Sequence, residues 1–252
     1  MGSRHLGGVA VGAEQKVCPN YRPIRGHTFH VSSNSVPDCW LSIRARFSLF
    51  CKSVPVCRSD LEELKLSGFL AGDQGRNPKT GELALSTRYR LKDNYARFYL
   101  KYMLPARDRI EKGLFEFVSL AGLAGWDAVM GLQFENLVVN NFKSLLPRLG
   151  LENVEILSAE PYRRAAGKGH PGCQIDLLIQ TERYAFIVEV KRQKSIGQKA
   201  IDGIAAKVAA LPREKTTSVR TALVYDGTLE PCVKAMRAYD FLIPSEELLM
   251  LS

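Results

Sequence analysis

The chain has 252 residues, of which 46% are hydrophobic and 24% charged, an ordinary composition for a globular protein of one large or two small domains. No apolar run approaches the roughly 20 residues of a membrane span, and the opening "MGSRHLGGVAVGAEQ" is too poor in apolar residues for a secretory signal, so we expect a cytoplasmic protein without a membrane partner. The formal net charge of +9 favours a polyanionic partner, and we expect DNA.

Residues 1–58 differ from the rest of the chain in charge and in pattern. They carry eight Lys or Arg residues and two acids, which accounts for +6 of the total +9. The stretch "CPNYRPIRGHTFHVSSNSVPDCW" mixes Pro, Gly, Ser, Cys and His without the period of a helix or a strand. We therefore predict a poorly structured, basic N-terminal extension.

Residues 59–92 predict a helix followed by a β-hairpin. Ser59 and Glu62 have the spacing of a capping box, and Gly68 is placed to end the helix. The following "FLAGDQGRNPKTGELALSTRYRL" has apolar and aromatic ends around a tip rich in Gly, Asn and Pro. Because a helix and a hairpin form the closing half of a winged helix, we predict a partial winged helix here.

Residues 93–130 are predicted to form a helical linker. Asp93 is placed to cap the helix "NYARFYLKYML", and Pro105 is expected to end it. The aromatic residues of this helix recur at helical spacing, which favours core packing over base stacking. The apolar, Gly-rich residues 113–130 are expected to bridge two structural units.

Residues 131–252 carry the clearest pattern. An amphipathic helix over 131–149 is expected to bury one stripe, made of Phe134, Leu137, Val138, Asn141, Phe142 and Leu145. After it we predict strands at 154–157, 174–180 and 184–191, a helix at 197–211, a strand at 218–225, a helix at 229–238, a strand at 241–243 and a terminal helix from Ser245. This order predicts an α/β domain with a mixed sheet flanked by helices.

Three charged residues interrupt the apolar run "IDLLIQTERYAFIVEVKRQ". Glu189 and Lys191 face the same way on one strand, and a hairpin pairing brings Asp176 of the preceding strand near Glu189. Asp176 itself is expected to point away from both its neighbours in sequence. Two carboxylates in a half-buried site repel each other unless a cation lies between them, and hard oxygen ligands suit Mg²⁺ or Mn²⁺. The alternative is a charge ladder on an exposed sheet face, which the apolar "IVEVK" disfavours.

A third acid and a second lysine have open assignments. Glu135 lies at the margin of the stripe on the 131–149 helix, where it either reaches the metal or is a solvated flank residue. Lys207, on the helix after the third strand, faces either the site or water.

A helical Glu135, then Asp176, then a turn and a strand bearing Glu189-x-Lys191 resembles the PD-(D/E)XK nuclease superfamily. The resemblance implies a restriction-endonuclease-like αβββαβ core. It also implies that Glu135, Asp176 and Glu189 bind Mg²⁺ or Mn²⁺, that these three and Lys191 are catalytic, and that the reaction is hydrolysis of DNA phosphodiesters.

A further resemblance covers about residues 59–252. "LSGFL…YRLKDNYARFYLKYMLP", "FENLV" and "IDLLI…VEVK" resemble the C-terminal part of archaeal-type AAA+ ATPases, the domain of unknown function 234. The motif G-x-x-x-x-G-K-[ST] does not occur in the sequence, so we expect no ATP site. The resemblance implies a C-terminal fragment of such an ATPase without its P-loop domain.

Basic residues outside the charged triplet are candidates for contact with nucleic acid. Arg163, Arg164 and Lys168 belong to a Gly-rich basic stretch, and Arg76 and Lys79 belong to the hairpin tip. Ordinary solvated surface is the alternative for all five. Two functions stay open. One is a Mg²⁺-dependent nuclease, and the other is a non-catalytic module that binds DNA or protein, or forms homo-oligomers, and keeps the fold without the chemistry.

Overall fold

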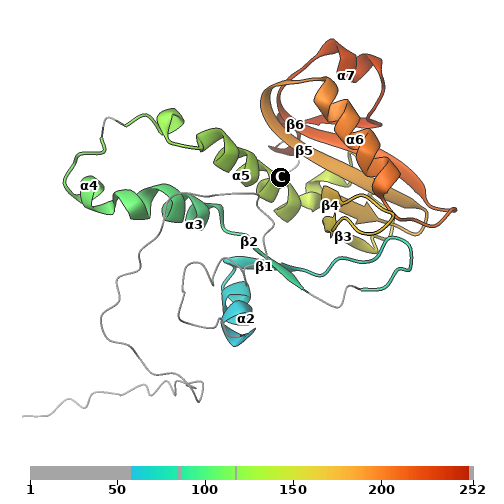
Figure 1. Cartoon of the computed structure of the whole chain (residues 1–252), viewed down its shortest axis with the longest axis horizontal. Coiled ribbons are helices and arrows are strands. Elements are labelled where there is room, and N and C mark those ends of the chain that lie inside the picture. The colour runs from blue at the N-terminus through green and yellow to red at the C-terminus, as the bar shows by residue number, and fades with distance from the viewer. Residues whose placement is uncertain (1–57, 84–86, 117, 250–252) are drawn as a thin grey trace, which may run out of the picture. The chain divides into compact units, whose positions relative to one another are not determined.

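The computed structural model describes residues 58–83, 87–116 and 118–249 (Figure 1). The extension predicted for residues 1–58 therefore lies outside the described residues, apart from Arg58.

A five-stranded mixed sheet is the centre of the C-terminal half. Its strands lie in the order of the sequence: β3 (Ser158–Arg164), β4 (Cys173–Gln180), β5 (Tyr184–Ile196), β6 (Ser218–Leu229) and β7 (Phe241–Pro244). The β3–β4 and β4–β5 pairs are antiparallel, whereas β5–β6 and β6–β7 are parallel. A loop (165–172) joins β3 to β4 and a short turn joins β4 to β5, whereas a helix connects each parallel pair, as the longer crossover requires.

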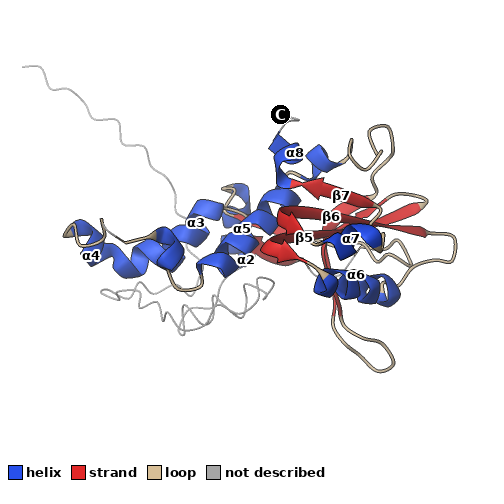
Figure 2. Cartoon of the chain, turned by 90° about the horizontal axis from the view of Figure 1, so that it is seen from above, coloured by secondary structure: helices blue, strands red, loops and turns tan. Residues whose placement is uncertain are grey.

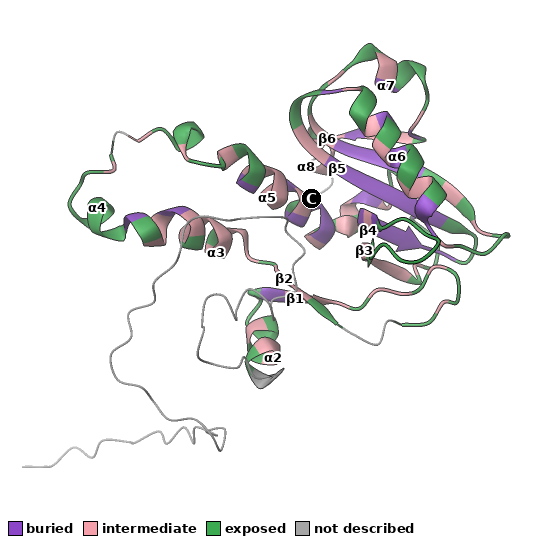
Figure 3. Ribbon diagram, viewed as in Figure 1, coloured by how far each residue is buried: buried purple, intermediate pink, exposed green. Residues whose placement is uncertain are grey.

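Helices cover both faces of this sheet (Figure 2). One core cluster packs α5 (Trp126–Asn140), the 3₁₀ turn η4 (Phe142–Leu145) and α8 (Ser245–Leu249) against one face. The other cluster packs α6 (Gln198–Ala210) and α7 (Pro231–Ala235) against the opposite face. Because both faces are covered, β4 is buried along most of its length, and β5 and β6 are each buried in a continuous central segment (Figure 3). The predicted α/β class, with a mixed sheet flanked by helices, is confirmed.

The first helix of this domain differs from its prediction in extent and orientation. It begins at Trp126 rather than 131 and ends at Asn140, after which η4 continues as a separate turn. Leu137 is 44% exposed and Asn141 is exposed, so the predicted stripe is wrong at both positions. The reason is that α5 is also covered on a second side, where Asn136 is buried against the Lys92 carbonyl, so the buried side of the helix includes Asn136 and not Leu137.

Two further boundaries were wrong. Residues 154–157 are not a strand, although the Leu157 N–H donates to the Gln180 carbonyl at 2.8 Å, and β3 begins one residue later.

Pro105 does not end the linker helix. The chain passes from α3 (Asn94–Phe98) through a π-turn (Tyr99–Met103) into a 3₁₀ turn (Leu104–Ala106) and α4 (Arg107–Glu111). Pro105 lies at the start of that 3₁₀ turn, where its missing N–H costs no hydrogen bond.

The helix and hairpin predicted upstream are present as α2 (Arg58–Leu66), β1 (Leu70–Asp73) and β2 (Arg88–Leu91). The two strands pair antiparallel from Leu70↔Leu91 to Asp73↔Arg88. Gly68 has a φ of +80°, the left-handed conformation with which a glycine ends a helix. The division of the chain into a partial winged helix, a linker and a nuclease-like domain stays a prediction.

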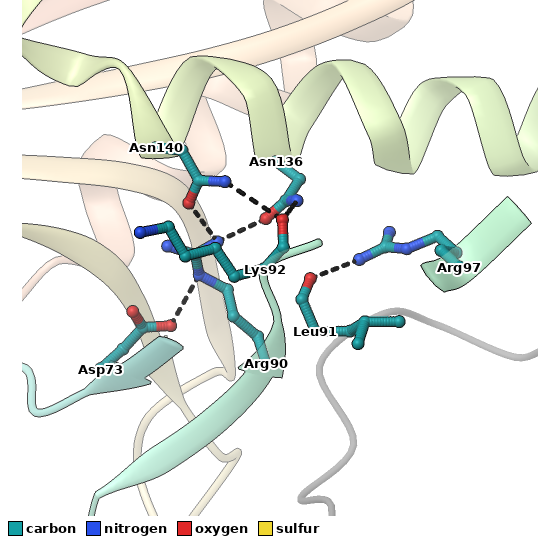
Figure 4. Close-up of polar contacts among 7 residues, drawn as sticks. All are labelled: Asp73, Arg90, Leu91, Lys92, Arg97, Asn136 and Asn140. Atoms are coloured by element: carbon teal, nitrogen blue, oxygen red, sulfur yellow. Dashed lines mark hydrogen bonds and ion pairs between the residues drawn. The ribbon is translucent and has the colours of Figure 1, made fainter. Parts of the chain in front are cut away.

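A buried polar network joins the hairpin to α5 (Figure 4). The Arg90 guanidinium contacts Asp73 Oδ2 at 2.9 Å and donates to the side-chain oxygens of Asn136 and, at 2.8 Å, Asn140. The Asn136 amide in turn donates to the Lys92 carbonyl at 2.6 Å. Because the contacts to Asn136 and Asn140 cross from the hairpin to α5, the network holds α5 in one orientation relative to the hairpin.

Candidate active site

Asp176 lies where strands β4 and β5 separate. Their ladder ends at the pair Leu177↔Val188, so the next backbone groups of β5 have no ladder partner on β4. The Asp176 carboxylate takes that place, and its Oδ2 accepts from the Val190 N–H at 2.9 Å. This bond fixes a carboxylate, 7% exposed, at the point where the sheet opens.

A β-bulge in β4 turns Asp176 toward the α6 face. Glu160 pairs with Leu178 and Tyr162 pairs with Ile175, so two steps along β3 match three along β4. Ile175 and Leu178 consequently belong to the same core cluster, which strict alternation forbids. The expectation that Asp176 points away from both its neighbours was therefore wrong, because alternation fails at the bulge.

Glu189 is surrounded by two lysines. Its side chain is 3% exposed, and Lys191, on the same strand face, places Nζ 3.9 Å from Glu189 Oε2. Lys207 of α6 is closer: its Nζ donates to Glu189 Oε1 at 2.5 Å and also to Oε2. Both oxygens of Glu189 therefore accept from the same ammonium.

Opposing effects act on the charge of Glu189. Burial, followed by the charge of Asp176 and a hydrogen bond to it, favours the neutral acid, while Lys191 and Lys207 favour the carboxylate. The effects that favour the neutral acid are larger, so the pKa of Glu189 is raised from 4.5 to about 8. Because Asp176 and Glu189 disfavour each other's ionisation, an additional cation between them would stabilise their charged forms.

A pocket of about 490 Å³ opens over these groups. Its charged lining residues are Glu135 from α5, Asp176 from β4, Lys191 from β5 and Lys207 from α6. The remaining lining residues are Leu132, Pro171, Gly172, Cys173, Gln174, Val190, Gly203, Ala206 and Ala210. Four separate elements therefore present ionisable side chains to one space, beside the buried Glu189.

The sequence left Lys207 open between the site and water and assigned it no role, and the structure places it in the pocket. A signal for it was present, because Gly203, Ala206 and Ala210 surround it on one side of α6. A lysine among such small residues has room to extend along the helix toward the sheet.

The acids of the pocket suit a divalent metal ion only in part. Among the described residues, no group of three or more His, Cys, Asp or Glu side chains converges closely enough to hold one. Asp176 and Glu189 nevertheless interact directly, and the Lys207 ammonium lies against Glu189 where a cation is expected. Mg²⁺ is commonly held by one or two carboxylates with waters and substrate phosphates, so this pair fits that ion.

The predicted nucleic-acid residues divide into two groups. Arg163 and Lys168 are exposed, and Arg164 donates to the carbonyl of Ala210, a pocket residue, at 2.6 Å. These three lie on β3 or in the loop that leads to the pocket end of β4.

Arg76 and Lys79 of the hairpin lie elsewhere. The Arg76 carbonyl accepts from Gln180 at the opposite end of β4 from the pocket, and its guanidinium donates to the Gly81 carbonyl within the hairpin. Lys79 is exposed. The structure therefore does not bring these two basic residues to the pocket.

The chain was compared with protein families, curated proteins and solved structures, and the similarities found are low. No family model matches the chain, and no curated protein matches it. Among solved structures it is similar to a repair endonuclease from Pyrococcus abyssi, at 22% identity and a TM-score of 0.28, over 43% of this chain and 42% of that one. It is also similar to protein VC1899 from Vibrio cholerae, at 14% identity and a TM-score of 0.36, over 83% of this chain and 48% of that one. The chain spans less than half the length of either protein.

In the described ranges of the chain, no helix has the length and apolar character needed to cross a membrane.

Proposed function

We propose that this chain hydrolyses DNA phosphodiester bonds with the help of Mg²⁺ or Mn²⁺. The observation that carries the proposal is a single pocket beside the buried Glu189. Its lining includes the charged residues Glu135, Asp176, Lys191 and Lys207. Acids paired with amines in a half-enclosed space are suited to an anionic substrate that reacts through a doubly charged cation.

Asp176 and Glu189 would hold the ion, with Glu135 of α5 as a third ligand. When bound, the ion polarises a phosphoryl oxygen and lowers the pKa of a water molecule. The bulge keeps Asp176 turned toward the pocket, and the Val190 N–H orients its carboxylate. Lys191 would orient the attacking water or stabilise negative charge as it builds on the phosphate.

DNA is the proposed substrate because of charge. Arg163 pairs with the pocket residue Gln174, and Lys168 belongs to the loop whose residues Pro171 and Gly172 line the pocket. Both basic residues are exposed and would contact phosphates without reading sequence. We also propose that 59–92 is a partial winged helix and that the relation to archaeal-type ATPase C-terminal regions is genuine.

Cleavage of plasmid DNA in Mg²⁺ tests the proposal. Asp176→Asn, Glu189→Gln and Lys191→Met should each lower the cleavage rate by about 100-fold or more, as expected when one group that stabilises the transition state is removed. The matched control is Glu182→Gln, an exposed acid in the turn before β5, which should cleave like the wild type. Equal rates for wild type and Glu189→Gln, or no cleavage of duplex, single-stranded or branched DNA by any of them, would contradict the proposal.

A second candidate function is a non-catalytic DNA-binding module that retains this fold. It is favoured by one observation: among the described residues no three potential ligands converge as a metal site. Such a module would bind DNA equally in Mg²⁺ and in EDTA and would leave the DNA intact.

A further inference from the structure

The contact between Lys207 and Glu189 places a cation where the proposed metal ion would bind. Lys207 Nζ lies 2.5 Å from Glu189 Oε1 and also bonds Oε2, whereas Lys191 Nζ is 3.9 Å from Oε2. Of the two lysines, Lys207 therefore provides the nearer neutralising charge. In the absence of a metal ion, both oxygens of Glu189 thus accept hydrogen bonds from the Lys207 ammonium.

Charge balance explains this contact. Asp176 and Glu189 are buried acids in direct interaction, and burying a charge is unfavourable unless a partner compensates it. Lys191 and Lys207 supply two positive charges, which balance the two acids when both are ionised. Adding a divalent ion to Glu189 would leave three cationic centres around two carboxylates, and the ammonium that shares the oxygens with the ion is the one repelled most strongly.

The Lys207 side chain also has space in the pocket to move away from Glu189. Its side chain is 20% exposed and lines the pocket, and the neighbouring Gly203, Ala206 and Ala210 are small. A four-carbon stem with room around it can turn its ammonium from Glu189 toward the open space of the pocket. In the proposed reaction, that space holds a phosphate of the substrate.

We propose that Lys207 is the resident counterion of Glu189, that a divalent cation displaces it, and that the released ammonium then binds a DNA phosphate. This inference rests on the proposed function and adds a coupling between metal entry and substrate binding. Before the ion binds, Lys207 is held by Glu189 and contributes little to DNA affinity. After the ion binds, Lys207 is free to contact the DNA.

The first test measures Mg²⁺ binding by isothermal titration calorimetry on the full chain, without DNA. Lys207→Met removes the competing cation and should tighten Mg²⁺ binding by about 10-fold, the scale on which one charge at contact distance shifts a neighbouring equilibrium. Lys207→Gln, which keeps a hydrogen-bond donor but no charge, should do the same and serves if the methionine variant does not fold. Lys199→Met, at an exposed position on the same helix, should leave the affinity unchanged.

The second test measures binding of a labelled phosphorothioate duplex, which slows hydrolysis, in Mg²⁺ and in EDTA. Lys207→Met should weaken DNA binding several-fold in Mg²⁺ and should have no effect in EDTA, where Glu189 holds the lysine in the wild type. A merely structural lysine would change DNA binding equally in both conditions.

The outcomes separate this inference from the proposed function. Mg²⁺ affinity that is measurable but equal in wild type and both Lys207 variants would overturn the counterion role and leave the nuclease proposal intact. DNA binding that weakens equally in Mg²⁺ and in EDTA would overturn the release of Lys207 to the phosphate. No Mg²⁺ binding by any variant would remove the metal site itself, and the nuclease proposal with it.

Discussion

Glu189 is the residue on which the proposed chemistry of the pocket depends most. It is an acid in the interior of a sheet, and burial together with Asp176 raises its pKa to about 8, while Lys191 and Lys207 oppose that rise. The folded protein therefore tolerates the carboxylate only because two ammoniums lie near it. Buried acids with strongly shifted pKa values occur mainly at functional sites, which supports a functional role for Glu189.

The raised pKa of Glu189 predicts a dependence of stability on pH. The folded pKa, about 8, is above the ordinary value of 4.5, so between these values the folded state binds more protons than the unfolded state. The free energy of unfolding should therefore fall as pH rises through this window. Glu189→Gln cannot titrate, so its loss of stability between about pH 5 and about pH 9 should be smaller by at least about 1 kcal/mol.

Urea unfolding at several pH values measures this difference. Glu182→Gln, at an exposed position in the turn before β5, is the control and should follow the wild-type pH profile. If wild type and Glu189→Gln lose stability in parallel, Glu189 does not titrate in this window and the repulsion from Asp176 is not strong.

At the scale of elements, the site is assembled from irregularities rather than from regular strands. The bulge turns Asp176 toward α6, and the separation of β4 from β5 leaves the Val190 N–H for its carboxylate. The hairpin acts on the site from a distance: its Arg90 fixes Asn136, the residue next to Glu135 on α5. The orientation of one proposed ligand thus depends on an element that contributes nothing to the pocket lining.

Arg90→Met should reveal how much the network contributes. The side chains of Arg90 and Asp73 are 9% and 11% exposed, and the substitution leaves the buried Asp73 carboxylate without this partner. Burial already raises the pKa of Asp73, with Arg90 opposing the rise, so the destabilisation should be large. We expect the free energy of unfolding to fall by about 3 kcal/mol, the usual cost of breaking a buried ion pair from one side.

Chemical denaturation of the single and double variants checks this expectation. Combining Arg90→Met with Asp73→Asn should cost less than the sum of the two single changes, because the uncompensated charge is gone. Arg107→Met breaks an exposed pair with Glu111 and should change stability by less than about 0.5 kcal/mol. A change that small for Arg90→Met would show that the network contributes little.

For the whole molecule, charge is distributed unevenly. Residues 1–58 hold +6 of the net +9, so the described residues are only mildly basic. The proposed DNA binding by this part of the chain would therefore rely on local clusters of basic residues, and the loop after β3 contributes Pro171 and Gly172 to the pocket lining.

The salt dependence of DNA affinity tests this cluster. Replacing Arg163 and Lys168 by Gln should weaken duplex binding and should lower the slope of log affinity against log salt by about one for each phosphate that is no longer neutralised. Fluorescence anisotropy over a range of salt concentrations measures the slope. Arg107→Gln, on α4, should leave it unchanged, and an unchanged slope for the double variant would exclude these residues from the DNA interface.

The sequence alone determined the order of elements, because apolar periodicity and strand composition report whether a segment is buried on one face or two. It also indicated that Asp176, Glu189 and Lys191 belong to adjacent strands, since a short polar turn leaves an antiparallel hairpin as the simplest pairing. Only the tertiary structure decided which way Asp176 points, because a bulge has no signature in local periodicity. It also decided that Lys207 reaches Glu189 and that the hairpin clamps α5, since both interactions join residues far apart in the chain, whose proximity depends on packing.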